Sequence, residues 1–325
     1  MKLTYEQIQS IARGAVRIDP SDGRIRLCRL TAEQEALFDA RSEFLSVRAQ
    51  ASAGIRLEFR TDSSMLSFTV QTALGSATKT FTYDLFVNGQ FFDAWEGEQT
   101  EDGIFQKSCE LGVGVKDICL YFPWSVRTEI LSLELEDNST VTPLCRSKKM
   151  LMFGDSITQG AIAKHPSRTY ASQLADALDA EAFNKAIAGD VFYAPYAKLA
   201  EDGDFDYVTV AYGSNDWKKT TRESFVQNCT AFYRTLSQKY PTAKIFAITP
   251  IWRADPDRIT DVGSFLFIKD TIAQVTASLP NVTLIEGFDF VPKDPKYFAD
   301  LRLHPNDEGF DFYADALIRE IKKHL

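Results

Sequence analysis

The stretch Met150-Leu-Met-Phe-Gly-Asp-Ser-Ile-Thr-Gln-Gly160 joins a short apolar run to a small polar turn that carries the hydroxyl of Ser156. A short apolar run that ends in a turn is typical of a strand buried on both faces. After this turn, short apolar segments alternate with amphipathic segments as far as the end of the chain. This βα alternation predicts an α/β fold with a parallel sheet covered on both faces.

The strands expected in this half are 149–153, 182–184, 207–212, 244–249 and 282–285. The helices expected between and after them are 170–178, 222–239, 268–278 and 308–323. In open parallel sheets, ligands bind outside the carboxyl ends of the strands. Polar turns fall at three of these ends: Gly154-Asp-Ser156, Ala188-Gly-Asp190 and Gly213-Ser-Asn-Asp216. We therefore expect three loops to converge on one edge of the sheet.

The first 145 residues have a different pattern, because short alternating or β-branched segments follow one another between turn signals such as Asn88-Gly89. The strands expected there are 44–48, 55–59, 65–70, 80–87, 118–122 and 130–135, after a short helix at 5–13. Such spacing favours a jelly-roll-like β-sandwich. The prediction is two domains, a sandwich at 1–145 and an α/β domain at 146–325, with a linker at 140–148.

Composition excludes several classes of function. The chain has 325 residues and a net charge of −9, so it lacks the basic character of nucleic-acid-binding or membrane-surface proteins. Neither a signal sequence nor a membrane-spanning apolar stretch is recognisable, which predicts a cytoplasmic protein unless a leader has been removed. The five cysteines are scattered and favour buried reduced thiols, and no spacing suits a metal or other cofactor.

A serine hydroxyl becomes a nucleophile only when a base contacts it and an acid orients that base. Only three histidines are available. His324 ends the last helix, and His165 lies in the loop after the serine, which suits a loop residue or a substrate contact. His304 precedes Pro305, which disfavours helix and leaves the histidine on a loop. Ser156, His304 and the nearby Asp300 therefore form a candidate catalytic set.

Because of these residues, the C-terminal half resembles the SGNH, or GDSL-like, hydrolase family of esterases and lipases. Four blocks carry the resemblance: Gly154-Asp-Ser156, Ala188-Gly-Asp190, Gly213-Ser-Asn-Asp216 and Asp300 with His304-Pro305. The resemblance implies a flavodoxin-like three-layer α/β/α domain. It also implies an oxyanion hole formed by the amides of Ser156 and Gly189 and the side chain of Asn215.

One departure concerns the acid. The family's pattern is D-x-x-H, whereas Asp300-Leu-Arg-Leu-His304 has three intervening residues. Asp300 is the expected orienting acid, and Asp294 or a backbone carbonyl are the alternatives. Asp155 and Asp216 are expected to shape the turns by accepting backbone hydrogen bonds.

The aromatic and cationic residues Trp217, Trp252 and Arg253 follow the third and fourth strands and are candidates, with His165, for contacts to a substrate. In the first domain, Trp95 and Trp124 are expected in the core. That domain resembles the β-rich modules that precede the hydrolase domain in some bacterial carbohydrate-active esterases.

The resemblance implies a serine esterase that works through an acyl-enzyme, and we expect a carbohydrate or another small-molecule ester of a short acyl group as substrate. One alternative is an inactive glycan-binding protein, and another is a lipase or thioesterase. No nucleic-acid or membrane partner is expected, and a homo-oligomer is compatible with the sequence.

Overall fold

The computed structural model describes residues 1–325, which divide into two compact units. The N-terminal unit comprises Met1–Arg146 and Lys164–Ser167, and the C-terminal unit comprises Ser147–Ala163 and Arg168–Leu325. The predicted boundary after residue 145 lies beside this division. The segment 164–167, which the sequence placed in the second domain, groups with the first unit.

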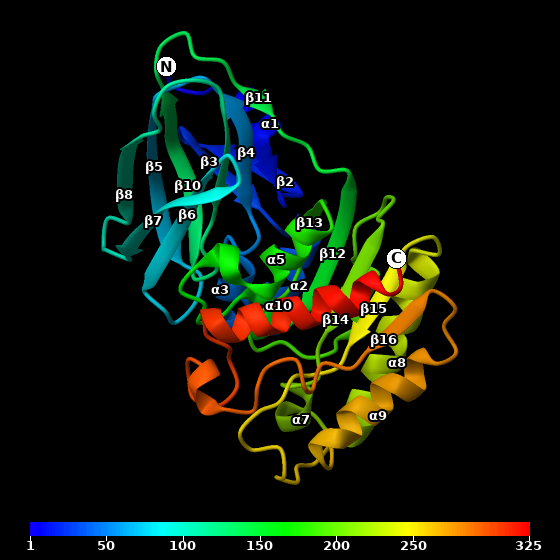
Figure 1. The fold of residues 1–325 in the computed structure, drawn as a ribbon. Coiled ribbons are helices and arrows are strands. Elements are labelled where there is room, and N and C mark those ends of the chain that lie inside the picture. The colour runs from blue at the N-terminus through cyan, green and yellow to red at the C-terminus, as the bar shows by residue number, and fades with distance from the viewer. The chain divides into compact units, whose positions relative to one another are not determined.

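The N-terminal unit contains two antiparallel sheets, as expected for a β-sandwich module (Figure 1). One sheet has the order β1-β4-β9-β6-β7, with β11 beside β4, and the other has the order β2-β3-β10-β5-β8. The strands are β1 Ala12–Arg13, β2 Arg17–Ser21, β3 Arg24–Cys28, β4 Arg56–Thr61, β5 Met65–Leu74, β6 Thr80–Val87, β7 Gln90–Glu98, β8 Ile104–Glu110, β9 Lys116–Tyr121, β10 Val126–Leu135 and β11 Thr142–Pro143.

Alternation along the strands builds the core of this unit. In β5, every second residue from Leu66 to Thr72 is buried, which places one face of the strand in the interior. Phe68 on that face packs edge-on against Tyr83, with ring centroids 5.4 Å apart. Trp95 and Trp124 are also buried, as predicted for core residues.

Helices replace strand where local capping outweighs β propensity. Residues 44–48, expected as a strand, lie in α3 (Glu43–Ala49), because the hydroxyl of Ser42 caps the helix by accepting from the amide of Leu45. Before it, α2 (Ala32–Arg41) was not predicted, although it begins with a reciprocal capping box between Thr31 and Gln34. The first helix, α1, is shorter than expected and spans Tyr5–Ile11.

The C-terminal unit is built on one parallel sheet with the order β13-β12-β14-β15-β16. Its strands are β12 Lys148–Gly154, β13 Ala180–Asn184, β14 Tyr207–Ala211, β15 Lys244–Ile248 and β16 Val282–Ile285. Counted from β12, this is the 2-1-3-4-5 order of flavodoxin-like folds. All five predicted strands are present.

Helices cover both faces of this sheet (Figure 1). They are α4 Ser156–Gln159, α5 Tyr170–Ala177, α6 Ala194–Lys198, α7 Asp216–Lys219, α8 Arg222–Lys239, α9 Phe265–Thr276 and α10 Asp307–Lys322. The four predicted helices correspond to α5, α8, α9 and α10.

Neighbouring side chains of β12 show the three layers. Met150 and Met152 belong to a buried cluster with Leu174 of α5 and Leu317 of α10. Phe153 points the other way and packs edge-on against Phe232 of α8, with ring centroids 5.6 Å apart. A strand buried on both faces explains the continuous apolar run at 150–153.

The five cysteines differ in how deeply they are buried. All five cysteines are free, and Cys28 and Cys229 are buried. Cys145 is exposed, so the expectation of buried thiols is wrong for that residue.

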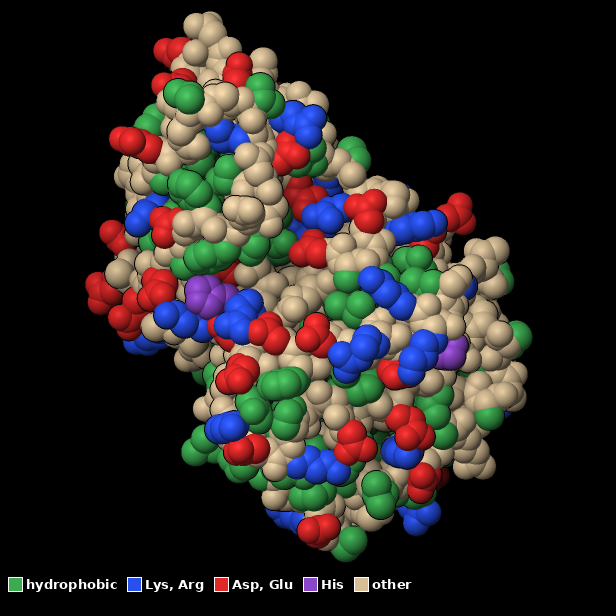
Figure 2. Space-filling view, viewed as in Figure 1, with side chains coloured by type: hydrophobic (Ala, Val, Ile, Leu, Met, Phe, Trp, Pro, Cys, Tyr) green, Lys and Arg blue, Asp and Glu red, His purple; other side chains and the backbone are tan.

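Acidic and basic side chains are interspersed over the face shown in Figure 2. No helix combines the length and the apolar character that a membrane span requires.

Candidate active site

The nucleophile candidate lies where β12, the first strand of the parallel sheet in chain order, ends. β12 runs between β13 and β14, and Ser156 begins the one-turn helix α4 directly after it. Asp155 caps that helix by accepting from the amide of Ile157 at 3.1 Å, and Gly160 ends it with a φ of +92°. The turn therefore fixes the serine, which keeps 7% of its surface exposed.

The structure brings Ser156, His304 and Asp300 into one hydrogen-bonded chain. The distance between Ser156 Oγ and His304 Nε2 is 2.8 Å, and that between His304 Nδ1 and Asp300 Oδ2 is also 2.8 Å. A carboxylate at Nδ1 selects the tautomer that carries the proton there and leaves Nε2 to accept from the serine. This geometry is suited to proton transfer from the hydroxyl.

The unusual spacing between Asp300 and His304 is absorbed by a tight turn. Leu301 adopts a left-handed conformation with a φ of +56° and is exposed. Asp300 Oδ1 accepts from the amides of Arg302, Leu303 and His304, while Oδ2 stays with the imidazole. The extra residue therefore bulges outward, and the carboxylate still reaches the ring.

Hydrogen bonding also decides the charge of Asp300. Burial alone would raise its pKa, but the hydrogen bonds from the His304 ring and from the amides of Leu303 and His304 outweigh burial and lower it. Asp300 is thus a carboxylate at neutral pH. The alternative acid, Asp294, instead accepts from the amide of Lys296 and begins a 3₁₀ turn.

The second block forms a tightly bonded loop after β13. The amide group of Asn184 donates to the carbonyl of Thr158 at 2.8 Å, and Gln159 accepts from the amide of Ala188. Both contacts join this loop to α4. Gly189 has a φ of +89°, a conformation that favours glycine, so its place in the block has a backbone reason.

The third block places Asn215 beside that loop. Its Nδ2 donates to the carbonyl of Asp190 at 3.1 Å, which uses one of its two protons and leaves the second for another acceptor. The residue directly precedes α7. Ser156, Gly189 and Asn215 remain the predicted oxyanion donors.

Lys219 lies beside the candidate site, although no sequence motif singles it out. Its ammonium donates to the carbonyl of Gly189 at 2.6 Å. Burial raises the pKa of Asp155, and Lys219 lies close enough to oppose this increase, as His304 does. The lysine follows Asn215 by four residues, a spacing that identifies it only once α7 is known to be helical.

Two acids of the blocks are fully buried. Asp155 accepts from Ile157 and Asp216 accepts from the amide of Phe192 at 3.0 Å, as expected for turn-shaping residues. Burial raises the pKa of Asp155 to about 6 and that of Asp216 to about 8. Asp216 is consequently a neutral carboxylic acid at pH 7.

The predicted substrate contacts differ in their surroundings. Trp217 and Arg253 have 0% of their surface exposed, and Trp252 is half-buried and packs against Phe298. A ligand would have to displace the groups that cover Trp217 and Arg253 before touching them. Their buried positions favour a supporting role, while substrate contact remains a prediction.

His165 is held in the N-terminal unit. Its Nδ1 lies 2.8 Å from Oδ1 of the buried Asp84 in β6, and its ring meets Phe91 of β7 edge-on. Ser167 donates to the same carboxylate through its amide and its hydroxyl. These contacts fasten the segment 164–167, and a role of His165 toward substrate remains a prediction.

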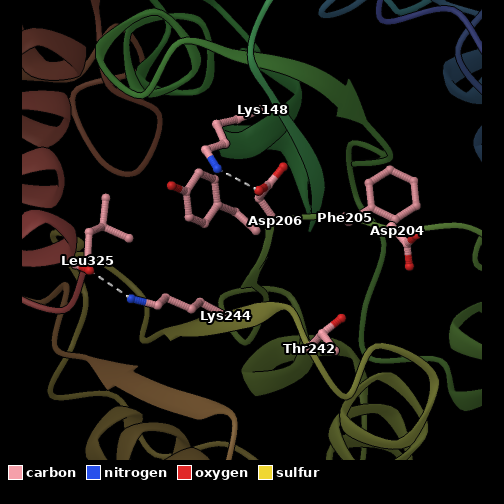
Figure 3. Close-up of a pocket in the computed structure, with 8 residues that line it drawn as sticks. Lys148, Asp204, Phe205, Asp206, Thr242, Lys244 and Leu325 are labelled. Atoms are coloured by element: carbon pink, nitrogen blue, oxygen red, sulfur yellow. Dashed lines mark hydrogen bonds and ion pairs between the residues drawn. The ribbon is translucent and has the colours of Figure 1, made fainter.

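A cavity of about 440 Å³ lies at the opposite edge of the sheet (Figure 3). Lys148, Tyr207 and Lys244, the first residues of β12, β14 and β15, line it. Lys148 bonds to Asp206 at 2.9 Å, and Lys244 donates to the oxygens of His324 and Leu325. The cavity is therefore distinct from the serine site.

No group of three or more His, Cys, Asp or Glu side chains is arranged to hold a metal ion.

Residues 152–312 match the GDSL-like Lipase/Acylhydrolase family. The C-terminal unit contains a GDSL-like lipase/acylhydrolase domain. The match begins inside β12 and ends inside α10, so it includes all four blocks that carry the resemblance. A comparison with curated protein sequences found no match.

Solved structures with the same fold include two kinds of enzyme. A salicylyl-acyltransferase of a tetracycline biosynthetic pathway, SsfX3, is 22% identical, with 96% of this chain and 94% of that chain covered and a TM-score of 0.80. A family two carbohydrate esterase from Clostridium thermocellum, in complex with cellohexaose, is 17% identical, with 84% and 93% covered and a TM-score of 0.66. An acetyl xylan esterase from Butyrivibrio proteoclasticus is 15% identical, with 83% and 90% covered and a TM-score of 0.60.

The buried acid of the GDSL-like domain makes stability depend on pH. Because the pKa of Asp216 is raised in the folded state, its stabilising contribution is full below pH 4 and is lost as pH rises toward about 8. We expect Asp216→Asn to gain stability relative to the wild type over this range, by up to about 1.4 kcal/mol per pH unit. Urea unfolding at several pH values measures the difference. The exposed Asp257→Asn is the control, and parallel profiles for Asp216→Asn and wild type would contradict the prediction.

Asp300→Asn tests the orienting acid. Asparagine keeps the oxygen that accepts the three amides, but its NH₂ group faces His304 Nδ1 and favours the wrong tautomer. We expect kcat for a p-nitrophenyl ester to fall by roughly 10³ to 10⁴-fold without unfolding. Asp294→Asn should leave kcat within about twofold. The reverse ranking of the two variants would assign the orienting role to Asp294.

Lys219→Met tests the cation beside the Gly189 loop. Loss of the ammonium removes the hydrogen bond to the Gly189 carbonyl and a positive charge beside Gly189, a predicted oxyanion donor. We expect kcat to fall by about tenfold, and Lys219→Arg to restore part of it. The exposed Lys198→Met is the matched control. Equal activity of Lys219→Met and Lys198→Met would exclude a role at the site.

Proposed function

We propose that this protein is a serine hydrolase of carboxylic esters that removes a short acyl group, such as acetyl, from a carbohydrate. The observation that carries the proposal is the hydrogen-bonded chain of Ser156, His304 and Asp300, with 2.8 Å at each step. Such a chain activates a hydroxyl for attack on a carbonyl carbon. Membership of residues 152–312 in the GDSL-like family supports the same chemistry.

In the first half of the reaction, Ser156 Oγ attacks the ester carbonyl while its proton moves to His304 Nε2. The carbonyl oxygen becomes an oxyanion, which the amides of Ser156 and Gly189 and the side chain of Asn215 stabilise. Collapse of this intermediate breaks the bond to the alcohol, and the leaving oxygen takes the proton from His304. The products are an acyl-enzyme and the free alcohol.

In the second half, His304 Nε2 accepts a proton from water as the water oxygen attacks the acyl carbon. The ester bond to Ser156 Oγ then breaks, and the serine recovers a proton from His304. The ionised Asp300 stabilises the imidazolium that forms at each step. The cycle returns every group to its starting state.

The substrate class rests on the solved relatives. Two of them are a carbohydrate esterase seen with cellohexaose and an acetyl xylan esterase, and this favours an acylated sugar. A second candidate function is acyl transfer to an alcohol, because the acyltransferase SsfX3 matches over 96% of this chain. The two functions share the acyl-enzyme and differ only in whether water or an alcohol attacks it.

The first test compares Ser156→Ala and His304→Ala with the wild type on p-nitrophenyl acetate. Each variant should lose about 10⁵ to 10⁶-fold in kcat, and the double variant should lose no more, because the residues act as a unit. The exposed Ser278→Ala is the matched control and should retain full activity. Retention of most turnover by Ser156→Ala would exclude the proposal.

A substrate screen then separates the related functions. Acetylated sugars and p-nitrophenyl esters of increasing chain length should show a preference for acetyl over octanoyl. A preference for long chains would indicate a lipase, and product acylated on an added alcohol would indicate a transferase. Failure to react with a fluorophosphonate, together with measurable glycan affinity, would indicate a binding protein instead.

A further inference from the structure

The predicted oxyanion donor Asn215 stands on a short piece of structure. It precedes α7, which has four residues, and its side chain makes no capping hydrogen bond. A single helical turn has no stability of its own, since nucleation fixes several residues for one hydrogen bond. The position of Asn215 therefore depends on what holds α7 and the residues before it.

Arg253 provides two of these contacts. Its side chain is 1% exposed, and its Nη1 donates to the carbonyl of Ser214 at 3.3 Å. Ser214 is the residue directly before Asn215. The guanidinium also lies over the ring of Trp217 in α7, with Cζ 4.7 Å from the ring centroid. Arg253 thus touches the chain on both sides of Asn215.

Asp255 completes this arrangement. Its Oδ1 accepts from Arg253 Nε at 2.6 Å, and its Oδ2 lies 3.2 Å from the ammonium of Lys218 in α7. Trp217 donates from Nε1 to the carbonyl of Gly263 at 3.0 Å. The loop from Arg253 to Gly263 therefore holds the Ser214–Lys218 segment at four points: a carbonyl, an aromatic face, an indole N–H and an ammonium.

The choice of arginine fits this geometry. Its planar fork bonds a carbonyl and a carboxylate in different directions while its face stacks on an indole, and lysine cannot do both. Burying a guanidinium costs free energy, and one carboxylate together with one carbonyl only partly offsets this cost. If only stability mattered at this position, an apolar side chain could fill the space without the free-energy cost of burying a charge.

We propose that Arg253 is a positioning residue that, together with Asp255, aligns the side-chain amide of Asn215 with the oxyanion of the proposed ester hydrolysis. The inference rests on the proposed function. Because Arg253 acts through Asn215, its removal costs activity only while Asn215 is present. It affects the transition state and leaves ground-state binding of the ester unchanged.

A double-mutant cycle tests this with Arg253→Lys, Asn215→Ala and the combined variant, assayed on p-nitrophenyl acetate. Asn215→Ala should lower kcat by roughly 10² to 10³-fold. Arg253→Lys should lower kcat by about tenfold with KM within about twofold, and should cost less than about twofold in the Asn215→Ala background. An equal loss from Arg253→Lys in both backgrounds, or no loss in either, would overturn the proposal.

The matched control is Arg29→Lys, which changes another buried arginine that donates to backbone carbonyls, those of Ala51 and Arg48. It should lower the midpoint of thermal unfolding as Arg253→Lys does while leaving kcat unchanged. A similar loss of kcat in Arg29→Lys would show that general destabilisation explains the effect.

If Arg253→Lys does not fold, Asp255→Asn takes its place, because it weakens the bond to Arg253 Nε and keeps an oxygen of the same size. It should lower kcat by about threefold in the wild type and have no effect in Asn215→Ala. Additive losses would again overturn the proposal. Failure of the proposed function looks different, because Ser156→Ala and Asn215→Ala would then retain activity as well.

Discussion

The hydrogen bond between Ser156 Oγ and His304 Nε2 joins two residues that are 148 positions apart in the chain. The rest of the C-terminal unit can be understood as the structure that brings them together. The serine stands at the carboxyl end of β12, and the histidine lies three residues before Asp307, the first residue of α10. Met150 and Met152 of β12 and Leu317 of α10 share one buried cluster, so packing of the core fixes both ends of this bond.

The strand order explains why the predicted oxyanion donors lie at one edge of the sheet. β12 lies between β13 and β14, so the loops after these three strands leave the sheet side by side at one edge. Each loop is then fixed by a bond to another: Asn184 donates to Thr158 in α4, and Asn215 donates to the carbonyl of Asp190. The order of strands thus supplies the neighbourhood, and these few polar contacts supply the alignment.

Periodicity could predict the C-terminal half of this fold because its strands are continuous apolar runs and its helices are amphipathic. The same reasoning failed at 44–48, where the cap supplied by Ser42 outweighs the β-branched and aromatic residues. In the site, motif spacing could single out Ser156 and His304. It could not show that a left-handed Leu301 lets Asp300 reach the ring, nor that Lys219 turns back to Gly189, because both depend on backbone conformation.

Charge around the candidate oxyanion site follows from burial as much as from residue type. Asp216 follows Asn215 directly, and an ionised carboxylate there would oppose a developing negative charge. Burial raises the pKa of Asp216 to about 8, so the group is neutral at pH 7. Lys219 and Arg253 meanwhile bond to carbonyls on either side of the donors, those of Gly189 and Ser214. A protein with a net charge of −9 thus keeps Asp216 neutral beside the predicted oxyanion donors and bonds two cations to carbonyls of the same loops, a local field that suits the proposed acyl transfer.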